Sequence, residues 1–66
     1  MLFLAQFKLR HTDERGHTHV ISTMLSGSNT FTRLVEADDK DGVMDILVRE
    51  YNGNEVFGVE ISGVLV

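Results

Sequence analysis

The chain has no cysteine, and this absence removes two ways in which very small domains are stabilised. Without cysteine there are no disulfides and no zinc framework of the CxxC kind. A chain of 66 residues forms one domain and buries only roughly 60% of the surface that it exposes when unfolded. We therefore expect residues 1–66 to form one small domain, stabilised by packing, by a bound ligand or by self-association.

A long apolar segment is also missing. No stretch of the chain reaches the roughly 18 consecutive apolar residues from which a membrane-spanning helix is built. The N-terminal sequence MLFLAQFKLR has no basic segment before its apolar residues and then alternates with polar ones, so it fits a strand better than a signal peptide. We therefore expect a cytoplasmic protein with no membrane partner.

Basic residues are few, six against ten acidic residues, which gives a formal net charge of −4. Surfaces that bind nucleic acid normally have clustered Lys and Arg side chains, so a nucleic-acid partner is not expected. Lys8, Arg10 and Arg15 lie near the start of the chain. The acidic residues gather further along: Glu36, Asp38, Asp39, Asp41 and Asp45. This predicts a basic end and an acidic end, which can steer a charged macromolecular partner.

Alternation of apolar and polar residues predicts that the chain begins with a half-buried strand, LFLAQFKLR. Its inward face has four residues: Phe3, Ala5, Phe7 and Leu9. The residues DERG then predict a turn, because Asp13 suits the first position of a type I turn and Gly16 accepts the left-handed conformation after it. We expect a second strand, roughly residues 17–25, to pair back on the first.

The second half of the chain predicts a third strand, a helix and a last strand. TFTRLVEA (30–37) alternates weakly, so it lies either at an edge or between two covered layers. DDKDGVMDILVREYNG predicts a helix with Asp38, Asp39 or Asp41 as its N-terminal cap and Gly53 after its end. Its apolar residues recur at helical spacing: Val43, Met44, Leu47, Val48 and Tyr51.

NEVFGVEISGVLV predicts the last strand, with Phe57, Val59 and Ile61 inward, Glu60 outward and Gly63 as a bulge. The order is strand, strand, strand, helix, strand, which predicts an α+β fold: a small antiparallel sheet with one helix packed on one face. Several apolar residues are left for the other face: Leu2, Leu4, Met24, Leu34, Val64 and Leu65. We expect a second copy or a partner to bury some of them, and hence a homo-oligomer.

The stretch RHTDERGHTHVI places all three histidines of the chain in one predicted hairpin. If the loop has three residues, His11 lies opposite His19 and both share a face with Asp13 and His17. Three imidazoles and a carboxylate suit zinc, nickel or copper, so this register predicts a transition-metal site at these four residues. If the loop has two residues, His11 points to the opposite face and the cluster is broken. The sequence leaves both registers open, and in either of them the histidines can instead be polar residues at the solvent-exposed tip of the hairpin.

No catalytic motif is recognisable. EADDKDG departs from a calcium loop, because Ala37 and Val48 would occupy the first and last ligand positions. GSN and GNEVFG lack the lysine and the following helix of a phosphate-binding loop. A short hairpin also offers no pocket deep enough to keep water from a nucleophile. We therefore expect a protein that is not an enzyme.

The second half of the chain, a short strand ending in VEADD, a helix closed by NG and then a strand, is similar in pattern to many very small α+β proteins of bacteria and phages. Several of these, including phage inhibitors of host RNA polymerase and anti-CRISPR proteins, act by covering a surface of a larger host machine. The resemblance implies an inhibitor of a host or defence system, and it rests on size and fold pattern.

Two functional hypotheses follow. The first is a non-catalytic interaction protein that binds and modulates a larger protein partner through an acidic surface, with the hydroxyl of Tyr51 reaching the same interface. Its residues are Glu36, Asp38, Asp39, Asp41, Asp45 and Tyr51. The second is a small-ligand or metal-binding module whose site forms between the subunits of a homo-oligomer, lined by the histidine hairpin and by residues 26–29.

Overall fold

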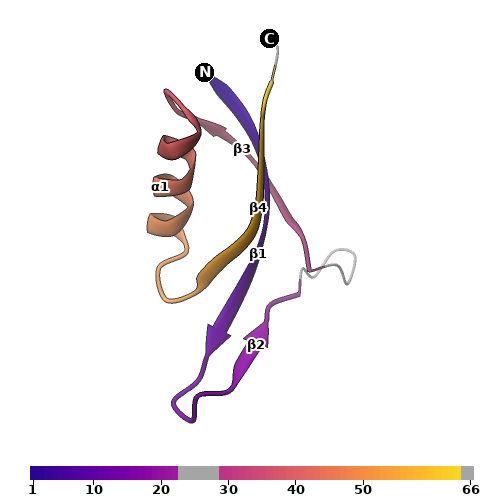
Figure 1. Ribbon diagram of the computed structural model, residues 1–66, viewed down its shortest axis with the longest axis vertical. Helices are drawn as coiled ribbons and strands as arrows, with labels where there is room; N and C mark the ends of the chain where they lie inside the picture. Colours follow the sequence, from indigo (N-terminus) through magenta and orange to yellow (C-terminus); the bar gives the residue numbers. More distant parts are fainter. Residues whose placement is uncertain (23–28, 65–66) are drawn as a thin grey trace.

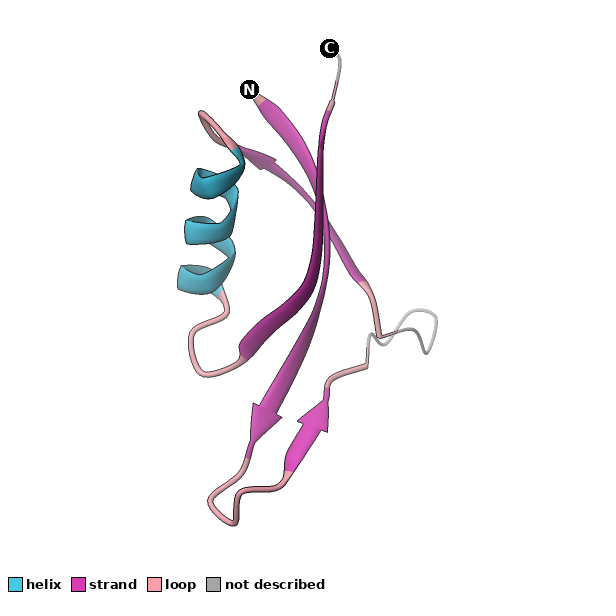
Figure 2. Cartoon of the chain, in the orientation of Figure 1, coloured by secondary structure: helices cyan, strands magenta, loops and turns pink. Residues whose placement is uncertain are grey.

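The computed structural model describes residues 1–22 and 29–64 as a four-stranded antiparallel sheet with one helix beside it (Figure 1). The elements along the chain are β1 (Leu2–Thr12), β2 (Thr18–Val20), β3 (Phe31–Glu36), α1 (Lys40–Glu50) and β4 (Glu55–Gly63). The molecule is elongated, with extents of 44 × 25 × 15 Å. The helix lies along one face of the sheet (Figure 2). This confirms the α+β fold and the order predicted from the sequence.

Strand β1 is the centre of the sheet, because each of the other three strands pairs with it in the antiparallel sense. Strand β4 pairs along one edge, between Phe3 and Arg10. Strand β3 pairs with Leu2 to Phe7 and β2 with Arg10 to Thr12, so both lie along the opposite edge, one after the other. Strands β2 and β3 therefore behave as one interrupted strand, and β3 lies at an edge.

The second strand is shorter than predicted, because β2 ends at Val20 and the remainder of the predicted strand, residues 23–25, lies outside the described residues. Ile21 still donates its amide to the carbonyl oxygen of Leu9 at 2.9 Å. The hydroxyl of Ser22 donates to the side chain of Asn29 at 3.1 Å.

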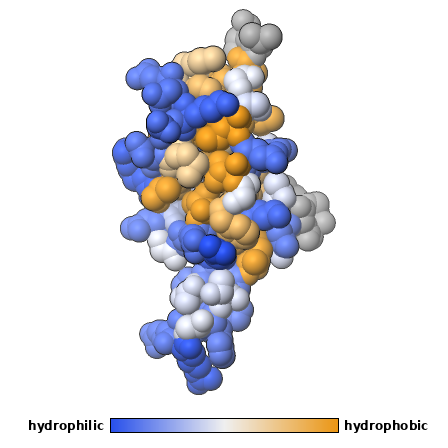
Figure 3. Space-filling model, viewed as in Figure 1, coloured by the Kyte–Doolittle hydropathy of each residue, from blue (hydrophilic) through white to orange (hydrophobic). Residues whose placement is uncertain are grey.

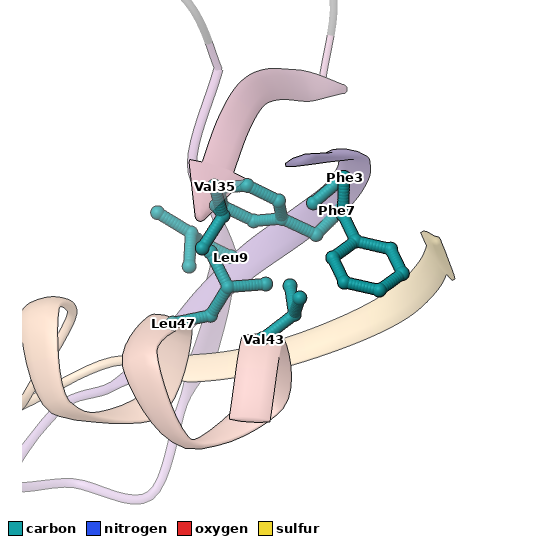
Figure 4. Close-up of a cluster of buried hydrophobic side chains, with 7 residues drawn as sticks. Phe3, Phe7, Leu9, Val35, Val43 and Leu47 are labelled. Carbon is teal, nitrogen blue, oxygen red and sulfur yellow. The ribbon is translucent and has the colours of Figure 1, made fainter. Parts of the chain in front are cut away.

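The core lies between the sheet and α1 (Figure 4). Its buried side chains are Phe3, Ala5, Phe7, Leu9, Val35, Val43 and Leu47. The first four confirm the inward face predicted for β1. Since successive side chains of a strand point to opposite faces, the even-numbered residues of β1 point away from α1. The sheet therefore has one face covered by the helix and one open face.

Helix α1 is capped by an aspartate, as predicted. The side chain of Asp39 accepts a hydrogen bond from the amide of Gly42 at 2.8 Å. This bond satisfies one of the amides that have no partner within the first turn of a helix. Asp41 lies in that first turn, where the helix dipole favours a negative charge. Of the aspartates that were candidates for the cap, the structure thus assigns the role to Asp39.

The predicted apolar stripe of α1 is correct only in part. Val43 and Leu47 are buried, but Val48 is 58% exposed. Ile46, which was not in the predicted stripe, packs against the core instead. Each residue turns the helix by about 100°, so the residue after Leu47 faces well away from a contact surface centred on Val43 and Leu47. The stripe is narrower than the sequence suggests, and Val48 faces solvent.

Strand β4 contains a bulge, but not at the predicted position. Its pairing with β1 is irregular between Gln6 and Lys8, where Gly58 adopts a positive φ of 60°. A bulge adds one residue and so reverses the alternation of faces. Phe57 consequently pairs with Lys8 and lies on the open face, while Gly63 pairs regularly with the start of β1. The predictions that Phe57 points inward and that Gly63 forms the bulge are wrong.

Replacing Leu47 tests the packing of α1. Leu47→Ala removes a fully buried side chain, and we expect the free energy of unfolding to fall by about 2–5 kcal/mol. Val48→Ala, one residue further along, changes an exposed side chain and should alter it by less than about 0.5 kcal/mol. Chemical denaturation of both variants measures the difference. Equal losses would contradict the packing described for the helix.

Candidate functional site

The β1–β2 hairpin has the register in which the histidines are grouped. His11 lies opposite His19. The amide of Asp13 donates to the carbonyl oxygen of His17 at 2.9 Å, and the amide of Gly16 donates to the carbonyl oxygen of Asp13 at 3.0 Å. Gly16 has a φ of 83°, as expected for the residue that closes this turn. The structure thus selects the three-residue loop from the two registers that the sequence left open.

Asp13 is the centre of the hairpin tip. Its Oδ1 accepts hydrogen bonds from the amides of Arg15 and His17, each at 2.9 Å. Its Oδ2 lies 3.3 Å from Nε2 of His19 and 3.9 Å from Nδ1 of His17. The hydrogen bond from the His17 backbone is the main cause of a lowered pKa of Asp13, partial desolvation opposes it, and the His19 side chain adds to it. The carboxylate therefore organises both the turn and two of the histidines.

The four residues are not arranged around one metal ion. His11 turns toward the loop after α1, with its Nδ1 3.4 Å from the carbonyl oxygen of Gly53. The side chains of His17 and His19 are 71% and 65% exposed. Within residues 1–22 and 29–64, no three His, Cys, Asp or Glu side chains are grouped to hold a metal. The transition-metal site predicted at His11, Asp13, His17 and His19 has no support from this geometry.

The predicted acidic surface lies at the end of the molecule opposite the hairpin, where α1 begins (Figure 1). Glu36 forms an ion pair, with its Oε1 2.6 Å from the N-terminal ammonium. Asp39 is engaged as the helix cap. Asp38, Asp41 and Asp45 are exposed carboxylates, and none of them has an ion pair with another described residue. We call these three residues the acidic helix surface.

The hairpin end is hydrophilic (Figure 3). Arg15 has Asp13 and Glu14 as its neighbours in the turn, and Arg10 is paired with Glu55. Neighbouring carboxylates therefore offset the two arginines on which the predicted basic end depends. The acidic end is the stronger electrostatic feature at neutral pH.

Tyr51 does not belong to the acidic helix surface. It is the C-terminal cap of the 11-residue helix, about 16 Å from the end where Asp39 lies. Its ring centroid is 5.3 Å from that of Phe7, and the guanidinium of Arg33 lies 5.9 Å from the ring. Arg33 also forms an ion pair with Glu50. Tyr51 therefore closes one end of the core, and the predicted interface that combined it with the aspartates is divided.

On the open face the structure brings together three residues that the sequence did not connect. The guanidinium of Arg10 donates to the carboxylate of Glu55 at 2.6 and 2.5 Å and lies 4.7 Å from the ring centroid of Phe57. This hydrogen bond is the main cause of a raised pKa of Arg10 and a lowered pKa of Glu55. The available signal was Gly58, because a glycine inside a strand often marks a bulge.

Comparison of the chain with protein families, with curated proteins and with solved structures finds no match in any of the three. None of the described residues forms a helix that is long and apolar enough to span a membrane. The function is therefore argued from the chain's own residues.

Asp13 should make the hairpin sensitive to acid. Its pKa is lower in the folded chain than the ordinary value of about 3.9. The ionised carboxylate thus favours the folded turn above that pH, and the contribution is lost as the pH falls through the lower, folded value. We expect the amide of His17, which donates to Asp13, to lose protection against hydrogen exchange below about pH 4.

The variant Asp13→Asn separates charge from hydrogen bonding, because an amide oxygen can still accept from both backbone amides. Protection of the His17 amide should then no longer depend on acid, whereas Asp13→Ala should lower it at every pH. NMR exchange rates, corrected for intrinsic chemistry, measure both effects. This role for the carboxylate would be contradicted if the His17 amide of the unaltered protein were equally protected against hydrogen exchange at neutral and acidic pH.

Proposed function

We propose that this protein is a non-catalytic interaction protein that binds and modulates a larger protein through the acidic helix surface. The observation that carries the proposal is that Asp38, Asp41 and Asp45, which lie just before α1 and along its first half, are exposed without a described ion-pair partner. Carboxylates in this state attract a basic surface of a partner and accelerate its association. The partner would therefore carry clustered Lys or Arg side chains.

The apolar interior also favours a binding role over catalysis. Among the described residues, every buried side chain is apolar. A reacting group usually needs a site that excludes water and shifts the pKa of an acid or base. The histidines lie instead on an exposed hairpin beyond the core, where water is not excluded. The resemblance to small phage proteins that cover host machines points in the same direction, as an analogy of size and pattern.

Charge reversal on the helix tests the proposal. Asp38→Lys combined with Asp45→Lys should weaken binding to the partner by at least about tenfold, or about 1.4 kcal/mol. Asp39 is left unchanged, because loss of the cap would itself cost about 1 kcal/mol of stability. The partner would be captured from a lysate of the organism that encodes the chain, identified by mass spectrometry, and titrated by biolayer interferometry.

The control is Glu14→Lys, which reverses the charge of one exposed side chain of the hairpin loop, as each of the two helix substitutions does. It should bind as the unaltered protein does. Circular dichroism would verify that all variants fold. Equal affinity of the helix variant and the unaltered protein would sink the proposal, and so would a loss of binding by Glu14→Lys alone.

A further inference from the structure

The open face of the sheet carries the most exposed apolar side chains of the strands. Its apolar members are Leu2, Leu4, Val20, Leu34, Phe57 and Val64. Leu34 is 59% exposed and Val20 is 46% exposed. In the described part of the chain α1 is the only helix, and it packs on the other face. Apolar groups gathered in this way usually mark an interface.

The chain exposes more surface than a compact monomer of its size, and this excess is similar to the area that one partner buries in a dimer interface. The chain exposes 4898 Å², whereas a compact monomer of 7.4 kDa exposes roughly 4,200 Å². Its radius of gyration is 12.8 Å, against about 10.8 Å for a compact chain of this length. The excess of roughly 700 Å² is close to the ~800 Å² that each partner buries in a standard interface.

The charges of the open face favour a second copy of the same chain. They are three positive and three negative groups: the N-terminal ammonium, Lys8, Arg10, Glu36, Glu55 and Glu60. Because the chain as a whole has a charge of −4, two copies repel each other least when they meet through this neutral surface. Lys8 and Glu60 have no described ion pair, which leaves one charge of each sign for a reciprocal pair across a two-fold axis.

We infer that two copies of this chain pack face to face through their open faces and form a symmetric dimer. Two sheets that pack in this way enclose a shared apolar layer, with their strands within about 30° of each other. Both copies of α1 would then lie on the outside, so each dimer presents two acidic helix surfaces. Such a dimer would bind a partner with two sites more tightly than one chain can.

Sedimentation analysis of the purified protein over a range of concentrations tests the dimer. We expect a mass of twice 7.4 kDa. Leu34→Lys should raise the dissociation constant of the dimer by at least about tenfold, because it places a charge in the shared apolar layer. Thr32→Lys, on the same face and already exposed and polar, should weaken the dimer as well without disturbing the core.

Val48→Lys is the matched control, because Val48 is 58% exposed against 59% for Leu34 but lies on α1. It should leave the dissociation constant within about twofold of that of the unaltered protein. A mass of 7.4 kDa at every concentration would overturn the inference. So would a dimer that survives both Leu34→Lys and Thr32→Lys, because the contact would then lie elsewhere, for example at the edge of β4.

This inference and the proposed function fail separately. The dimer is measured on the purified protein without any partner, and Asp38→Lys with Asp45→Lys should not change its mass. Conversely, a monomer could still bind a basic partner through α1.

Discussion

Every strand in the described part of the molecule is hydrogen-bonded to β1, and this pairing is the constraint on which the rest of the structure depends. The same strand supplies Phe3, Ala5, Phe7 and Leu9 to the core. A slip of one residue in its register would turn these side chains to the open face and break the contact with α1. Pairing and packing therefore specify the same alignment, which is why a sheet this small can have a unique register.

The core lies on one side of β1 only, between the sheet and α1. The hairpin extends beyond α1, so its histidines remain in water and have only Asp13 and the Gly53 carbonyl as described side-chain partners. The open face, by contrast, has apolar residues without a described cover. The two surfaces that we propose for binding, the acidic helix surface and the open face, lie on opposite sides of the sheet.

The acidic residues divide into those that stabilise the fold and those that are free to act. Asp39 caps α1, Glu36 holds the N-terminus and Glu55 holds Arg10 on the open face. These carboxylates have partners within the chain; loss of the Asp39 cap would cost about 1 kcal/mol of stability, whereas the exposed ion pairs of Glu36 and Glu55 contribute little. Asp38 and Asp45 have no such role, so the structure distinguishes residues that the sequence presents as one acidic run.

The sequence alone determined those elements of the fold that depend on residues a few positions apart. They are the alternation in β1, the turn closed by Gly16 and the helix that begins at an aspartate. The grouped histidine register was one of two that local rules permitted. Tertiary structure decided what depends on distant neighbours: the bulge at Gly58 that turns Phe57 outward, the pairing of β2 and β3 along the same edge of β1, and the separation of Tyr51 from the aspartates. Alternation assigns a side chain to a face only relative to a paired strand, and that strand comes from elsewhere in the chain.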